Sequence, residues 1–227
     1  MAGTTARRRV PAVLAAVAVT AALCALSGCG TDGAEDGGKA AAASATASAT
    51  PTGTDSDPAA KPAAKAGSIG AAGSACELPV TFDLAAEWTP EAVDVTTVPE
   101  LAALAEQGPM TMVCEIDAKP AGNIGYLRVW RGEKSSASPR EQLKAFVTAE
   151  EGASDATYTD IEAGTVAGAE ATYTVTVEAL DETKKERAFL VPTAQGPVVV
   201  HLGGLDTEEH EQMLPAYELA KSSLRAG

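Results

Sequence analysis

The stretch from Gly30 to Ala75 limits what this chain can fold into more than any other part of its sequence. It consists almost wholly of Gly, Ala, Ser, Thr, Pro and charged residues, and Ile69 is its only large apolar residue. Such a composition cannot bury enough apolar surface to offset the entropy cost of ordering the backbone. We therefore expect residues 29–75 to form a disordered tether. The alternative, Ala-rich helices, is disfavoured because prolines and glycines recur along the segment.

The residues before this tether have the pattern of a lipoprotein export signal. Three consecutive arginines precede an apolar run that ends at Leu26-Ser27-Gly28-Cys29. A basic start, an apolar run and small residues before a cysteine match the bacterial lipobox, where a diacylglycerol is joined to the cysteine sulfur before the signal peptide is cleaved. We expect residues 1–28 to be this signal peptide and Cys29 to be the lipidated first residue of the mature protein. A permanent transmembrane helix is disfavoured because the apolar run is short and contains a proline.

The lipid on Cys29 would also decide the compartment. Two acyl chains give stable anchoring where one does not, so we expect the protein at the cell membrane, on its extracytoplasmic face. Cys76 and Cys114 would then lie in an oxidising compartment, and we expect them to form one disulfide. These two cysteines are too far apart in sequence to be a CxxC redox pair.

The remaining residues, 76–227, have the apolar pattern of a single α+β domain. Proline at a helix start predicts a short helix at 99–105, and a capping box predicts a longer one at 138–150. A third helix is expected at 206–225, with a break or kink at Pro215. We expect an antiparallel central sheet with helix 138–150 on one face and helix 206–225 on the other. Its strands are expected at residues 78–84, 93–98, 110–116, 126–131, 157–161, 169–179, 187–191 and 198–202.

Several short stretches of this domain resemble a known family. The stretches are Phe82-Asp83-Leu84 with Trp88 a few residues later, the strand entry at 168–173, the strand at 198–202 and the closing helix at 218–225. With the lipobox and the tether, they resemble the PsbP-like fold family, especially the small actinobacterial lipoproteins of the LpqN/LpqT type. The resemblance implies an α/β/α sandwich in a family that mostly binds or scaffolds and shares no active site. The Cys76/Cys114 pair would be a local addition to that pattern.

Charge and composition exclude several classes of function. The chain carries a formal net charge of −14, so it lacks the clustered positive charge that nucleic-acid binding needs. It has two histidines and contains no GxSxG, SxxK or HExxH sequence. We therefore predict no catalytic residues, no cofactor and no nucleic-acid partner. His201, within an apolar strand, is interpreted as a structural residue.

Two small sets of residues are candidates for binding. Tyr126, Arg128 and Trp130 share one face of a strand; they would form a ligand platform if that face is open and core if a helix covers it. Asp206 and His210 are four residues apart on a helix, which makes them a weak candidate for a metal pair. An acidic helix N-terminus that complements the helix dipole explains the same pattern without a metal.

These observations predict a lipid-anchored envelope protein whose domain binds a small ligand or another envelope protein without chemistry. Two alternatives remain open. One is a carboxylate-dependent cell-wall hydrolase, and the other is a scaffold or chaperone for exported proteins.

Overall fold

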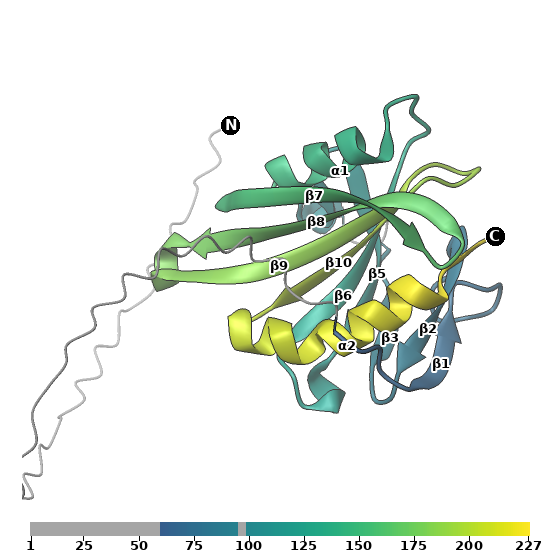
Figure 1. Cartoon of the computed structure of the whole chain (residues 1–227), viewed down its shortest axis with the longest axis horizontal. Coiled ribbons are helices and arrows are strands. Elements are labelled where there is room, and N and C mark those ends of the chain that lie inside the picture. The colour runs from purple at the N-terminus through teal and green to yellow at the C-terminus, as the bar shows by residue number, and fades with distance from the viewer. Residues whose placement is uncertain (1–59, 95–98) are drawn as a thin grey trace, which may run out of the picture. The chain divides into compact units, whose positions relative to one another are not determined.

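An antiparallel sheet forms the centre of the part of the chain that the computed structural model describes, residues 60–94 and 99–227 (Figure 1). Cys29 and the predicted signal peptide lie outside these residues. The strand order is β3-β5-β6-β10-β9-β8-β7, and β4 pairs with β5. The strands are β3 (Thr89–Ala92), β4 (Glu106–Gln107), β5 (Met110–Asp117), β6 (Gly125–Gly132), β7 (Ala153–Ala163), β8 (Val166–Val177), β9 (Glu182–Val191) and β10 (Val198–Gly204).

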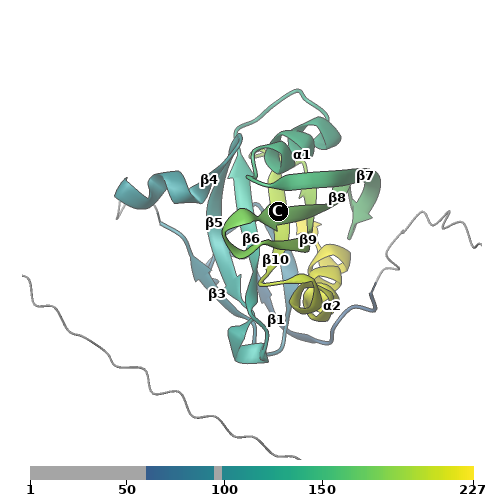
Figure 2. The ribbon, with the colours of Figure 1, turned by 90° about the vertical axis from the view of Figure 1, so that its left-hand side faces the viewer.

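The two long helices cover opposite faces of this sheet, as the sequence predicted. They are α1 (Pro139–Thr148) and α2 (Thr207–Ser223), and Figure 2 shows them on either side of β8 and β9. Phe146 of α1 packs in one buried cluster with Trp130 and Tyr173, whereas Tyr217 of α2 packs in a separate cluster with Phe189. The sheet therefore separates two hydrophobic cores, which we call the α1 face and the α2 face.

The helix starts follow the local signals. Ser138 accepts a hydrogen bond from the backbone N–H of Glu141, whose carboxylate accepts one from the backbone N–H of Ser138, so the predicted capping box is confirmed. Helix α2 begins after Asp206, whose side chain accepts from the backbone N–H of Glu209 at 2.8 Å. The expected break at Pro215 does not occur, because buried residues on both sides of it hold α2 against the sheet. The carbonyl of Pro215 accepts a hydrogen bond from the backbone of Ala63.

A second, three-stranded sheet contains a strand that the sequence analysis placed in the tether. Its order is β1-β2-β11, with β1 at Lys65–Ile69, β2 at Val80–Ala85 and β11 at Arg225–Ala226. Ile69 is buried in the core of the α2 face. The burial of Ile69 and the pairing of β1 with β2 hold this segment. The Ala63–Pro215 hydrogen bond and the Lys65–Asp83 ion pair add to these contacts. The folded part begins before Cys76.

The strand expected at 93–98 is also placed differently. Strand β3 lies earlier, at Thr89–Ala92, and pairs with β5; Val93 and Asp94 belong to no strand, and residues 95–98 lie outside the described part. Strand β3 contains Pro90, which cannot donate to a ladder, and it lies at the edge of the sheet, where a proline is tolerated.

Short 3₁₀ helices occupy three of the connections. They are η1 (Pro99–Ala105), where a short helix was predicted, η2 (Lys119–Ala121) and η3 (Glu178–Leu180). None of the helices in residues 60–94 and 99–227 is long and apolar enough to cross a membrane.

The predicted disulfide is present. Cys76 is bonded to Cys114, with their Cα atoms 6.0 Å apart, and both residues are buried. The bond joins the segment before β2 to the middle of β5, so it links the small sheet to the large one.

Candidate functional site

A polar cluster lies on the α1 face of the sheet, where most other side chains are apolar. Strand pairing sets Tyr173 of β8 directly opposite Glu186 of β9, and His201 of β10 lies on the same face. The His201 Nε2 atom contacts Glu186 Oε2 and lies 3.1 Å from the Tyr173 hydroxyl. That hydroxyl donates to Glu150 Oε2 at 2.7 Å. Glu150 lies just after the end of α1, and we call these four residues the α1-face cluster.

Two further side chains orient the carboxylates of this cluster. Lys184 Nζ lies 2.7 Å from Glu186 Oε1 and donates to the carbonyl of Gly204 at 2.8 Å. Gln107 of β4 donates to Glu150 Oε2 at 3.3 Å and to the carbonyl of Phe146 at 3.2 Å. A polar side chain from a strand therefore contacts each carboxylate and fixes its orientation.

The surroundings shift the pKa values of the two carboxyl groups in opposite directions. Glu186 is 2% exposed; burial opposes its ionisation, but His201 and Lys184 outweigh burial and lower its pKa to about 2. Glu150 is half-buried, and its pKa is raised mainly by burial, with the nearby Glu186 charge adding to the effect and His201 opposing it. Glu186 is thus the firmly ionised member of the pair.

The cluster has the donor atoms of a metal site. One atom from each of Glu150, Glu186 and His201 lies within 4.8 Å of the other two. No other group of three His, Cys, Asp or Glu side chains in the described part of the chain converges in this way. Zinc sites commonly use imidazole nitrogen and carboxylate oxygen together.

The predicted aromatic platform is divided between core and surface. Trp130 is buried and packs edge-on against Phe146 of α1, with ring centroids 5.4 Å apart. Tyr126 and Arg128 are half-buried; the Arg128 guanidinium lies 4.8 Å from the Tyr126 ring centroid and pairs with Glu115 at 2.7 Å. Because Arg128 is opposite His201 in the ladder, this half-buried pair flanks the α1-face cluster.

Asp206 and His210 serve different purposes in the structure. Asp206 caps α2, as described above, while His210 is fully buried and neither of its ring nitrogens has a hydrogen-bond partner in residues 60–94 and 99–227. Burial, helped by the charge of Arg187, lowers the pKa of His210 to about 4. His210 is therefore a neutral residue of the α2-face core at physiological pH.

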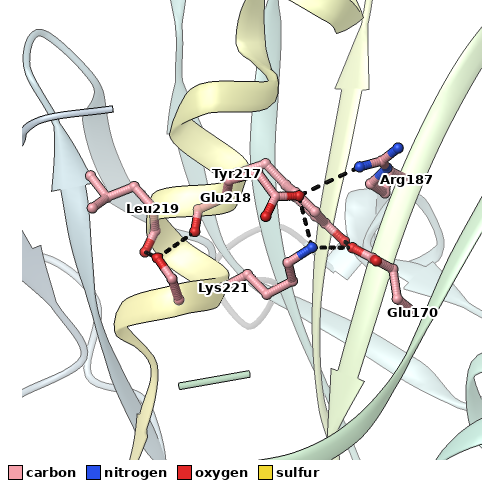
Figure 3. A network of polar contacts seen from close by, with 7 residues as sticks. Glu170, Arg187, Tyr217, Glu218, Leu219 and Lys221 are labelled. Carbon is pink, nitrogen blue, oxygen red and sulfur yellow. Dashed lines mark hydrogen bonds and ion pairs between the residues drawn. The ribbon is translucent and has the colours of Figure 1, made fainter. Parts of the chain in front are cut away.

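A second polar group, on the α2 face, ties α2 to the sheet (Figure 3). Lys221 Nζ lies 2.8 Å from Glu170 Oε1 and 2.7 Å from Glu218 Oε1. The Tyr217 hydroxyl donates to Glu170 at 2.8 Å, and Arg187 Nη1 lies 3.5 Å from Glu218 Oε1. This α2-face network pairs two carboxylates with two cations.

Sequence reasoning missed Glu150, Tyr173 and Glu186. Acidic residues occur throughout the chain, and no spacing links these three to His201, because strand pairing and the packing of α1 on the sheet bring them together. The one available signal was polar side chains next to or within apolar strands: Glu186 lies two residues before the apolar run at 188–191, and His201 interrupts the one at 198–202.

Comparison with known proteins identifies the family. Residues 44–224 match the model of a family described as uncharacterised lipoprotein. The chain belongs to this lipoprotein family. This confirms the prediction of an envelope lipoprotein at the level of the family, while lipidation of Cys29 stays a prediction. No curated protein is similar to the chain in sequence at a significant level.

Several solved structures are similar to this chain, among them a cyanobacterial one. The solution structure of cyanobacterial PsbP (CyanoP) from Synechocystis sp. PCC 6803 is 12% identical, with a TM-score of 0.47 over 66% of this chain and 87% of that one. A likeness of this strength carries no argument about fold or function. The PsbP-like and LpqN/LpqT-type resemblances therefore stay predictions.

Proposed function

We propose that this lipoprotein is anchored through Cys29 on the extracytoplasmic face of the cell membrane and binds a ligand at the α1-face cluster without transforming it. The observation that carries the proposal is that the carboxylates of Glu150 and Glu186 and the imidazole of His201 lie close together. Glu150 is half-buried, so this group of side chains is partly accessible to solvent. Stability of the fold does not require such an arrangement, since buried like charges oppose folding.

The predicted tether supports display of the domain away from the membrane. Between Cys29 and the start of β1 at Lys65, a flexible chain of this Gly- and Ala-rich composition has an r.m.s. span of roughly 30 Å. The ligand site would therefore be presented within the envelope rather than at the lipid surface.

The geometry favours binding over hydrolysis. Carboxyl oxygens of Glu150 and Glu186 lie within 4.8 Å of each other, which is shorter than the separation of about 6.5–9.5 Å between the carboxyl groups of inverting glycosidases. Glu186 is almost fully buried, which leaves no space for a sugar ring between the two groups. Within the described residues, His201 contacts no Ser, Thr or Cys that could serve as its nucleophile.

The hydrolase alternative has one observation in its favour. The pKa of Glu150 is raised and that of Glu186 is lowered, which is the separation expected of a general acid and a general base. We therefore include turnover in the test.

The test uses the full-length protein purified in mild detergent without an affinity tag. We expect a ligand, found by elemental analysis or by mass spectrometry of a denatured extract, to co-purify with the wild type and with the control Glu218→Gln. Glu218 is buried like Glu186 but lies on the other face. We expect Glu186→Gln to lose the ligand.

Three outcomes would contradict the proposal. The first is a wild-type protein that carries no ligand. The second is turnover of glycan or peptide substrates that Glu186→Gln abolishes, which would support the hydrolase. The third is crosslinking of the wild type and of Glu186→Gln to the same exported proteins with no ligand in either, which would support the scaffold.

A further inference from the structure

We propose that the ligand of the α1-face cluster is a divalent transition-metal ion of the zinc class, coordinated by Glu150, Glu186 and His201. This inference rests on the proposed function and specifies the chemistry of the same site.

The positions and types of the donor atoms fit such an ion. Zinc binds imidazole nitrogen and carboxylate oxygen at about 2.0–2.2 Å, so two ligands of one ion lie at most about 4.4 Å apart. The three donor atoms already lie within 4.8 Å of one another, and small side-chain rotations close the difference. An imidazole in the set favours zinc and its neighbours over magnesium and calcium, which prefer oxygen ligands alone.

The charges around the cluster also call for a cation. Lys184 pairs with Glu186 through Oε1, and Glu150 forms no ion pair within the described part of the chain. One lysine and, when it is protonated, His201 therefore face two carboxylates. A dication would compensate both of them at once, and it would reach the Glu186 Oε2 atom that Lys184 does not contact.

The neighbours of the three ligands act as a supporting shell. Tyr173 and Gln107 donate to Glu150, and Lys184 holds the other oxygen of Glu186. Metal ligands in proteins are typically oriented by such outer hydrogen bonds. Gly203 has no side chain, so it leaves the space beside Glu186 and His201 unfilled.

The Glu186 Oε2 and His201 Nε2 atoms are in direct contact, so an ion bound by both would lie between them. Both atoms would bind the ion through lone pairs, and a proton carried by either of them would leave to solvent.

The experiment is calorimetric titration of the full-length, untagged protein in detergent after chelator treatment, with ZnCl₂, MgCl₂ and CaCl₂ in separate runs. We expect one zinc per chain, with magnesium and calcium at least tenfold weaker. Glu150→Gln and His201→Gln should abolish stoichiometric binding. Tyr173→Phe, which removes an outer hydrogen bond, should weaken zinc binding about 10- to 100-fold.

Matched controls keep the outcome interpretable. Glu218→Gln, on the α2 face, should bind zinc as the wild type does. Glu150 is only half-buried, so Glu150→Gln should fold even if His201→Gln does not, and circular dichroism checks both. As an independent readout, Co²⁺ in the wild type should give visible d–d absorption that Glu150→Gln lacks.

Zinc binding that is absent, or equal in the wild type and Glu150→Gln, overturns the inference. If an organic ligand nevertheless co-purifies and is lost in Glu186→Gln, the metal inference fails and the proposed function stands. If neither metal nor organic ligand is found, both fail.

Discussion

The two polar groups on opposite faces of the same sheet differ in how their charges are arranged. In the α2-face network, Glu170 and Glu218 are matched by Lys221 and Arg187, and every pair joins α2 to a strand or to its own next turn. In the α1-face cluster, two carboxylates and an imidazole point at one another, and a single lysine supports one side. Burial is similar in both. The first arrangement stabilises the fold, whereas in the second only Glu186 is favoured as an anion, and Glu150 adds a cost that a bound cation would remove.

The largest expected effect comes from breaking the α2-face network. Lys221→Met leaves Glu170 and Glu218 without the cation that they share. We expect the free energy of unfolding to fall by about 3 kcal/mol, measured by urea denaturation with tryptophan fluorescence. Lys185→Met is the matched control, because its pair with Glu211 is exposed and should contribute less than about 1 kcal/mol. Equal losses in the two variants would show that the network is not structural.

The next effect is expected on the α1 face. Glu186→Gln removes the charged partner of Lys184 and His201, and hydrogen bonds to charged groups contribute about 1.5–3 kcal/mol. We expect a loss of about 2 kcal/mol at pH 7 without added metal, by the same denaturation assay. A variant as stable as the wild type would mean that the cost of burying Glu186 already cancels its contacts.

A third prediction concerns His210, the unpaired histidine of the α2 face. Its pKa is about 4 in the folded protein and about 6.5 when unfolded. The unfolded chain therefore takes up a proton first, and stability falls as pH drops from about 6.5 towards 4. Between pH 7 and pH 5 this residue should account for about 1–2 kcal/mol, which His210→Leu should remove. If the stability of the variant falls with pH as much as that of the wild type, a group other than His210 causes the acid sensitivity.

The smallest effect should have the opposite sign. The raised pKa of Glu150 means that the folded protein disfavours its charge, and glutamine can still accept the hydrogen bond from Tyr173. Without metal at pH 7, Glu150→Gln should be as stable as the wild type or slightly more stable, and the difference should vanish as pH falls and Glu150 takes up a proton. A clear loss of stability in thermal denaturation would make Glu150 a structural partner like those of the α2-face network.

Local signals predicted much of the fold. The capping box at Ser138 depends on residues close in sequence, and the structure has it. The strands expected at 110–116, 126–131 and 198–202 overlap β5, β6 and β10. Strand β1 was missed because Ile69 is a single apolar residue in a polar segment, and its pairing with β2 is a tertiary contact. Strand β3 was misplaced because it contains Pro90, and a proline is tolerated in a strand only at a sheet edge, a position that the tertiary structure decides.

What the sequence determined by itself is therefore the order of elements and the chemistry of single positions: the lipobox cysteine as a prediction, the cysteine pair, the helix starts and most strands. The tertiary structure alone decided the candidate site. Glu150, Tyr173, Glu186 and His201 come from a helix end and three strands, and strand register together with the packing of α1 brings their side chains together. Turn and capping signals act over a few residues. The side chains of the α1-face cluster meet only through contacts between residues far apart in sequence, which no local sequence pattern predicts.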